Sequence, residues 1–203
     1  MSDLLEQFGS IDIYLFDQLL RGNIRPGMRV LDAGCGGGRN LVYLLRERVE
    51  CFGVDRDAEG IGYVRAMAAK LAPGLAAENF RVEAVEAMSF ADGFADVVIC
   101  NAVLHFAADD VQFEGMVREL WRVLRPGGML FCRLASTIGG EFVPVAGSER
   151  RFLMPHGTEW YLVDEALLMG LTKELGGELV DPLKTTVVQG SRCMTTWVVR
   201  KSG

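Results

Sequence analysis

Two acidic residues, with a run of glycines between them, have the types and spacing needed to bind a cofactor. The chain reads VLDAGCGGGRN over Val30–Asn40, so a short apolar run ends at Asp32 and enters a glycine-rich turn. A second apolar run, over 51–54, ends at Asp55. Acids at the ends of two such runs, with a flexible turn after the first, are typical of a nucleotide-type cofactor site at the carboxyl edge of a parallel sheet.

The spacing of the glycines favours one kind of cofactor. A dinucleotide site favours G-x-G-x-x-G, whose third glycine lets a helix lie close to the strand beneath a pyrophosphate. Arg39 stands at the position of that third glycine. The glycines that could approach a ligand closely are Gly34, Gly36 and Gly38. S-Adenosylmethionine has no pyrophosphate, and its ammonium could face Asp32 while helix-start N–H groups face its carboxylate. Asp55 could then accept hydrogen bonds from the ribose hydroxyls.

Four segments in order resemble the class I S-adenosylmethionine-dependent methyltransferases. They are VLDAGCGGGRN, Val54-Asp55, FADVVICNAVLH at 94–105 and LRPGG at 124–128. The resemblance covers most of the chain. It implies an α/β, Rossmann-like fold with a seven-stranded, mostly parallel sheet in the order 3-2-1-4-5-7-6. Strand 7 is the antiparallel one, and helices cover both faces. The cofactor half is also weakly similar to the tellurite-resistance and thiopurine-type methyltransferases.

The resemblance implies a set of cofactor contacts around these motifs. They are Asp32, Gly34, Cys35, Gly36, Gly38, Asn40, Asp55, Arg56, Val85, Glu86, Ala87, Asn101 and Ala102. The sequence departs from the family pattern between the third and fourth strands. Ala84 stands where an acid usually binds the adenine amino group, and Ser89 stands where proline is usual. Glu83 or Glu86 could serve instead; we favour Glu86, and a solvated surface acid is the alternative. For Asn101 the alternative is a turn cap.

The acceptor side is less constrained by motif. His105 follows the fourth strand and could accept a proton from a nucleophile, or could simply pack against the cofactor. The candidate acceptor contacts are Tyr14, Phe106, Arg133 and Tyr161. Arg133 interrupts an apolar run and needs a partner, either a substrate anion or a loop carboxylate such as Glu141 or Glu159; we favour the carboxylate.

Hydrophobic periodicity gives a coarse order of elements within one domain over 1–203. Helices are expected at 10–22, 39–48, 58–71, 110–124 and 164–175, and strands at 28–31, 51–54, 80–83, 96–101, 129–134, 178–188 and 193–199. The last two strands should form an antiparallel hairpin. A lid helix within about 1–24 and an irregular insertion at about 135–163 are the expected places for acceptor recognition.

Composition restricts the function further. The chain has 203 residues, half of them hydrophobic, and a net charge of −6 without a basic cluster, which disfavours a nucleic-acid acceptor. Five scattered cysteines indicate reduced core thiols, and with two histidines we expect no metal site. No apolar run is long enough to span a membrane, so we expect a cytoplasmic protein, monomeric or homodimeric.

We therefore predict methyl transfer from S-adenosylmethionine to a small-molecule acceptor by in-line displacement. Two alternatives come from other classes. A non-catalytic S-adenosylmethionine-binding or regulatory protein would keep the glycine loop and lose acceptor access. An NAD-dependent oxidoreductase is disfavoured by Arg39 in place of the last glycine.

Overall fold

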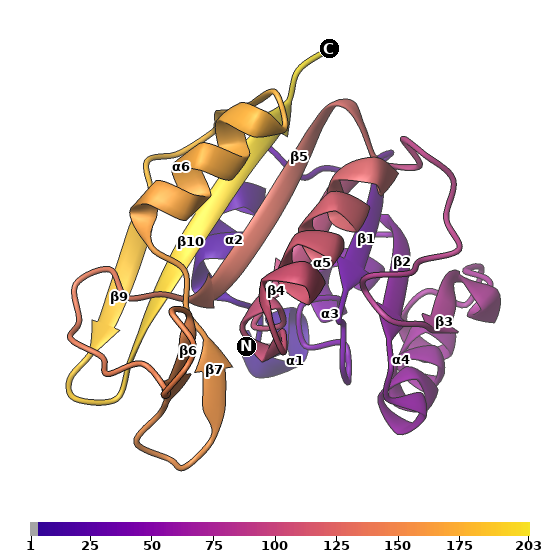
Figure 1. Ribbon diagram of the computed structural model, residues 1–203. Helices are drawn as coiled ribbons and strands as arrows, with labels where there is room; N and C mark the ends of the chain where they lie inside the picture. Colours follow the sequence, from indigo (N-terminus) through magenta and orange to yellow (C-terminus); the bar gives the residue numbers. More distant parts are fainter. Residues whose placement is uncertain (1–3) are drawn as a thin grey trace.

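A computed structural model describes residues 4–203 and shows a twisted sheet with helices on both faces (Figure 1). The strands of this sheet are β1 (Arg29–Ala33), β2 (Glu50–Asp55), β3 (Phe80–Val82), β4 (Ala95–Asn101), β5 (Leu124–Ala135), β8 (Gly177–Leu179), β9 (Lys184–Val188) and β10 (Arg192–Lys201). The α-helices are α1 (Leu4–Phe8), α2 (Ile13–Leu20), α3 (Val42–Arg46), α4 (Ala58–Leu71), α5 (Asp110–Val123) and α6 (Glu165–Glu174). Two short 3₁₀ helices complete the set, η1 (Ala77–Asn79) and η2 (Leu104–Phe106).

The strand order confirms the expected topology. The sheet runs β3-β2-β1-β4-β5-β10-β8, and β9 also pairs with β10. The strands from β3 to β5 are parallel to one another, whereas β10 is antiparallel to β5. Because β8 and β9 pair with different stretches of β10, they share the edge place of the expected sixth strand. β10 is the expected antiparallel seventh strand.

Several predicted boundaries were wrong. The predicted strand 178–188 is broken between β8 and β9, where Pro182 has no N–H to donate to a ladder. The predicted helix at 39–48 is reduced to α3, because the chain still forms turns as it leaves the glycine run. The helix predicted at 10–22 begins only after Asp12, which caps α2, and residues 1–3 of the predicted lid lie outside the described residues.

The insertion at 135–163 is more regular than predicted. It contains a second, two-stranded sheet, β6 (Arg151–Leu153) paired with β7 (Glu159–Tyr161). Figure 1 shows this hairpin below the carboxyl end of β5. The insertion therefore lies at the edge of the main sheet where the parallel strands end.

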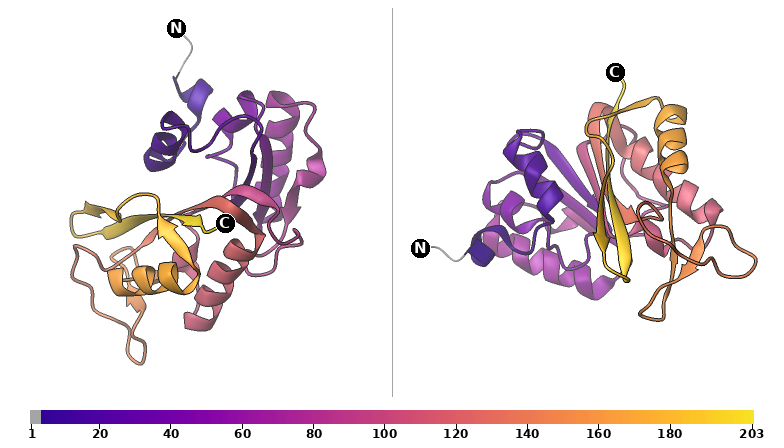
Figure 2. Two further views of the ribbon diagram at one scale, coloured as in Figure 1. Left: turned by 90° about the horizontal axis from the view of Figure 1, so that it is seen from above. Right: turned by 90° about the vertical axis from the view of Figure 1, so that its left-hand side faces the viewer.

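Alternating side chains place two apolar clusters on the two faces of the sheet. Val30, Ile99 and Phe131 belong to one cluster, which α2, α3 and α4 cover. Leu31 and Val98 belong to the other, which α5 and α6 cover. The left view of Figure 2 shows these helices on opposite sides of the sheet. The two covered faces leave the carboxyl edge of the strands for a binding site.

No helix among residues 4–203 is both long and apolar enough to cross a membrane. Over the same residues no group of three or more His, Cys, Asp or Glu side chains is placed to hold a metal ion.

Candidate cofactor and acceptor site

The glycine loop after β1 has a backbone that only glycine adopts easily. Gly34, Gly36 and Gly38 all have positive φ, of 81°, 49° and 79°. A Cβ atom on Gly34 would lie 2.3 Å from Cγ2 of Val103, so this position excludes every larger residue. The Gly34 N–H donates to the carbonyl oxygen of Val54 at 2.8 Å, which fixes the loop to the end of β2.

Asp55 holds the other side of the same loop. Its Oδ2 accepts a hydrogen bond from the Gly36 N–H at 2.7 Å, and its Oδ1 accepts one from the Asp57 N–H at 2.9 Å. A carboxylate oxygen has more than one lone pair, so each oxygen can accept a further bond. Asp55 is thus placed both to order the loop and to accept from two neighbouring hydroxyl groups.

Asp32 is a buried carboxylate at the end of β1. Its side chain is 1% exposed, and neither oxygen has a hydrogen-bond partner among the described residues. Burial raises the pKa of Asp32 to about 7, while the Arg39 guanidinium opposes this and the Asp55 carboxylate adds to it. An unpaired buried carboxylate is costly, and a cationic ligand such as an ammonium group would relieve that cost.

Two cavities follow the carboxyl edge on either side of the loop. One, of about 490 Å³, is lined by Gly34, Cys35, Gly36, Gly37, Arg39, Asn40, Asn101 and Ala102. The other, of about 470 Å³, is lined by Gly34, Gly36, Asp55, Arg56, Glu83, Val85, Ala102, Val103, Phe106, Gln112 and Met116. Because Gly34, Gly36 and Ala102 line both, the cavities are adjacent along the loop. An elongated ligand with two chemically different ends fits this arrangement.

At the end of β4, Asn101 lies between Arg39 and the sheet. Its Oδ1 accepts a hydrogen bond from Nη2 of Arg39 at 2.9 Å, and its side chain is 6% exposed. Its Nδ2 is buried without a partner in the described part of the chain. The next residue, Ala102, has a positive φ of 63°, a strained conformation for alanine. The amide is therefore available to a ligand in the cavity beside Arg39.

Arg39 is the main cavity residue that the sequence analysis did not assign to the site. In the sequence Arg39 was noted only as the residue that replaces a glycine, although its place between Gly38 and Asn40 in the loop could have indicated a site residue. Gln112 and Met116 were also missed, because both come from α5, far along the chain.

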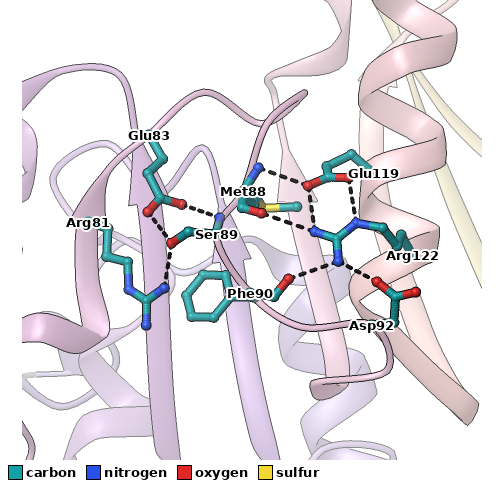
Figure 3. Close-up of polar contacts among 8 residues, drawn as sticks. All are labelled: Arg81, Glu83, Met88, Ser89, Phe90, Asp92, Glu119 and Arg122. Atoms are coloured by element: carbon teal, nitrogen blue, oxygen red, sulfur yellow. Dashed lines mark hydrogen bonds and ion pairs between the residues drawn. The ribbon is translucent and has the colours of Figure 1, made fainter.

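The segment between β3 and β4 is fastened at both ends (Figure 3). Glu83 accepts hydrogen bonds from the N–H and the hydroxyl of Ser89 at 2.8 and 2.5 Å. Arg122 on α5 donates to the carbonyl oxygens of Met88 and Phe90, at 3.0 and 2.8 Å, and forms ion pairs with Asp92 and Glu119. Ser89, at the family's proline position, therefore engages Glu83.

Glu86 is held differently. Its Oε1 accepts from Nε2 of Gln112 at 2.8 Å and pairs with Arg56 at 3.3 Å. Burial opposes ionisation, but the hydrogen bond from Gln112 and the Arg56 charge leave the pKa of Glu86 below its ordinary value. Glu83 and Val85 line the cavity here. Glu86 does not line it, but it accepts a hydrogen bond from Gln112, which does. Ala87 and Gly38 also lie outside both cavity linings.

His105 lies in η2 beneath an aromatic layer. Its ring centroid is 4.4 Å from those of Phe106 and Trp160, and it is 2% exposed. Burial lowers the pKa of His105 to about 4, so the ring is neutral near pH 7. Its Nδ1 has no partner among residues 4–203. Phe106, by contrast, is 63% exposed and lines the same cavity as Asp55.

Arg133 pairs with a carboxylate, as expected, but not with either predicted one. Its Nη1 lies 3.1 Å from Oδ2 of Asp12, the residue that caps α2. Glu159 instead pairs with Arg151. The prediction of Glu141 or Glu159 was wrong because Asp12 reaches the sheet from a segment 121 positions away.

The two candidate tyrosines have different surroundings. Tyr14 on α2 lies over Arg133, with 5.5 Å between the guanidinium carbon and the ring centroid, and its hydroxyl is 2.8 Å from that of Thr186. Tyr161 is buried in the core, stacked on Phe113 at 4.6 Å, with its hydroxyl donating to Asp110. Because it is buried, Tyr161 is a core residue and not an acceptor contact.

Comparison with known proteins agrees with this geometry. A sequence profile described as a methyltransferase domain matches residues 31–132, half of the chain. The chain belongs to the class I S-adenosylmethionine-dependent methyltransferases. A solved S-adenosylmethionine-dependent methyltransferase from Methanosarcina mazei superposes with a TM-score of 0.74 at 20% identity, over 91% of this methyltransferase and 97% of that chain.

Two curated relatives each match a little over half of this methyltransferase. One is an arsenite methyltransferase of Aquipseudomonas alcaligenes, 34% identical over 114 residues, which are 52% of this chain and 32% of the relative. The other is a ubiquinone biosynthesis O-methyltransferase of Pectobacterium carotovorum, 33% identical over 127 residues, which are 58% of this chain and 51% of the relative. The match thus spans between a third and a half of their length.

Proposed function

We propose that this chain transfers the methyl group of S-adenosylmethionine to a small-molecule acceptor by in-line displacement. The observation that carries the proposal is the pair of adjacent cavities along the loop, with the unpartnered Asp32 and Asn101 near one and Asp55 in the other. S-Adenosylmethionine supplies a methyl group on a positively charged sulfur, so the acceptor's lone pair forms the new bond while the carbon–sulfur bond breaks with its electrons to sulfur.

Each end of the two cavities offers groups of the right polarity. Asp32 lines neither cavity, but it interacts electrostatically with Arg39, which lines one, and its carboxylate is the group proposed for the ammonium. The Arg39 guanidinium provides a cation toward a carboxylate. Asp55 offers acceptors to both ribose hydroxyls. For the adenine amino group we keep Glu86, which does not line the cavity but contacts Gln112, which does; Glu83, the alternative acid, lines the cavity itself.

Catalysis of this kind rests mainly on holding the reacting groups in line and excluding water. We keep His105 as the candidate proton acceptor, because a neutral imidazole with an unpartnered Nδ1 can take a proton from an oxygen or nitrogen nucleophile. The exposed Phe106 ring could hold the acceptor's apolar part.

The curated relatives act on small molecules by their names, which supports a small-molecule acceptor. Arsenite itself is not favoured, because all five cysteines are buried and burial raises the pKa of the Cys35 thiol. The cytoplasmic location, the monomeric or homodimeric state and the absence of a nucleic-acid partner stay predictions.

Calorimetric titration with S-adenosylhomocysteine, with NAD as the control, tests the cofactor assignment. We expect micromolar binding of the former alone. Asp55→Ala should weaken that binding at least several-fold, because the ribose contacts and the hydrogen bond to the Gly36 N–H are both lost. Unchanged affinity would mean that Asp55 is wrongly assigned.

Screening thiol, chalcogen and phenol acceptors for methyl transfer would then test the reaction. Binding of S-adenosylhomocysteine without turnover on any acceptor would favour the regulatory alternative. Binding of NAD alone would favour the oxidoreductase.

A further inference from the structure

Arg133 and Thr196 face each other across β5 and β10, one strand beyond the cofactor cavities. They are register partners in the antiparallel pair, so their side chains share one face with Cβ atoms about 4.5–5.5 Å apart. Asn101 is the register partner of Arg133 on β4 and lies on the same face. Of these three residues only Asn101 lines the cavity beside Arg39. The Arg133–Thr196 pair therefore lies next to the cofactor site without being part of it.

Both members of the pair have buried polar atoms without a partner among the described residues. These atoms are Nε of Arg133 and Oγ1 of Thr196, and the latter side chain is 4% exposed. Nδ2 of Asn101 is a third such atom on this face. Two of the three can only donate a hydrogen bond, and the threonine hydroxyl can donate one. A ligand oxygen that accepts hydrogen bonds would satisfy them.

The guanidinium of Arg133 is only partly engaged. Its Nη1 pairs with Asp12 at 3.1 Å, and the Tyr14 ring lies over it, so α2 fixes its direction. The Nε edge remains for a second acceptor. An arginine fork presents N–H donors in the geometry that suits a carboxylate, which makes a carboxylate the best match for this edge.

A buried apolar cluster adjoins the pair along the same strands. The next register partners on this face are Ala135 and Met194, and they belong to a cluster with Phe152 and Leu162. Trp160 and Ala102 pack against that cluster, and Trp160 in turn contacts the His105 ring. Trp160 and Ala102 are only partly buried, and Ala102 lines both cofactor cavities, so a ligand with its charged end on Arg133 could lay an apolar body along these two residues.

We propose that Arg133 and Thr196 form the subsite that binds a carboxylate of the methyl acceptor, so that the acceptor is a small apolar or aromatic carboxylic acid. The carboxylate accepts hydrogen bonds from Nε of Arg133 and Oγ1 of Thr196, and the apolar body lies against Ala102 and Trp160. This inference rests on the proposed function and names the substrate class for the same site.

The test compares two phenols that differ only in the para substituent, a carboxylate in one and an uncharged hydroxymethyl group in the other. The full chain, saturated with S-adenosylhomocysteine, is titrated calorimetrically with 4-hydroxybenzoate and with 4-hydroxybenzyl alcohol. We expect the carboxylate to bind at least tenfold more tightly. Thr196→Val preserves shape and should reduce that preference about fivefold, and Arg133→Gln should abolish it.

Thr185→Val is the matched control. Thr185 is the register partner of Thr195, and its hydroxyl bonds that of Thr195 on the opposite face, so the preference should be unchanged. Thermal unfolding of each variant shows whether Arg133→Gln loosens α2; Thr196→Val keeps the test valid if it does.

The measurements distinguish failure of the proposed function from failure of the carboxylate subsite. If the wild-type chain does not bind S-adenosylhomocysteine, the proposed function fails and the subsite fails with it. If it binds but shows no carboxylate preference, or shows one that Thr196→Val leaves intact, the subsite alone is overturned. If neither probe binds to the chain saturated with S-adenosylhomocysteine, the subsite is also overturned.

Discussion

Asp32 illustrates how a single buried group can be tuned for a ligand at the expense of the free protein. Its carboxylate is charged in the unfolded chain above a pKa of 3.8, whereas burial raises the folded-state pKa to about 7. Between those values the folded state binds the proton more tightly than the unfolded state does. The free energy of unfolding therefore falls as pH rises through that window.

We predict that the ligand-free protein loses stability between pH 4 and 7 through Asp32, on the order of 2–4 kcal/mol. Asp32→Asn should remove this loss and raise the free energy of unfolding at pH 7.5 while weakening S-adenosylhomocysteine binding. Denaturant unfolding at several pH values measures the first effect and calorimetry the second. A pH dependence identical in wild type and variant would contradict the assignment.

His105 offers a second prediction at this scale. His105→Ala should leave the affinity for S-adenosylhomocysteine within about twofold, because the residue lines neither cofactor cavity. Turnover reports its role. A fall of about a hundredfold or more would identify a proton acceptor, whereas a fall below tenfold would leave His105 with the packing role shown by its contact with Trp160.

Among the elements, α5 supports the cavity that contains Asp55, because Gln112 and Met116 line it. Its Arg122 contacts the 88–92 segment and Glu119 (Figure 3). Arg118, four positions earlier, forms surface ion pairs with Glu114 and Glu174. The two arginines share a helix and a charge but differ in what they hold. That difference allows a matched comparison.

We predict that Arg122→Ala lowers the free energy of unfolding by about 2–4 kcal/mol, because two backbone carbonyls and two acids lose their donor. Arg118→Ala should cost only about 0–1 kcal/mol, as is usual for exposed ion pairs. Chemical denaturation of both variants checks this. Equal losses would mean that the 88–92 segment is not held by Arg122.

Across the whole molecule, a chain of contacts joins the N-terminal segment to the cofactor loop and to the far strands. The Asp12 N–H donates to Oδ1 of Asn40 at 3.1 Å, and the Asp12 side chain pairs with Arg133. Tyr14 reaches Thr186 on β9. Ordering the loop around a ligand should therefore also stabilise α2, which lies over this face of the sheet (Figure 2).

Hydrogen exchange tests that coupling. Saturating S-adenosylhomocysteine should slow exchange of the α2 amides as well as those of the loop, while amides of α6, on the opposite face, should change only by the global stabilisation. Asn40→Ala should remove the extra protection of α2. Protection confined to the loop in the wild type would show that α2 is independent of the cofactor site.

The elements near the motifs were largely predictable from sequence, and those held by distant partners were not. The strand order agrees with what the family resemblance implies, and α4 matches its predicted range. The interruption between β8 and β9 and the β6–β7 hairpin were missed, because a short polar stretch carries little periodic signal. Tyr161 illustrates the limit, since its burial depends on Phe113 and Asp110 from α5.

The sequence by itself determined the family and the cofactor, because the four motifs, the glycine loop among them, are short runs of consecutive residues whose types and spacing are local properties. Only the tertiary structure decided the acceptor side. There Asp12, Arg133 and Thr196 meet through strand register and helix packing over long separations in the chain. Which buried donors remain unpaired is a property of the packed molecule, and no local pattern encodes it.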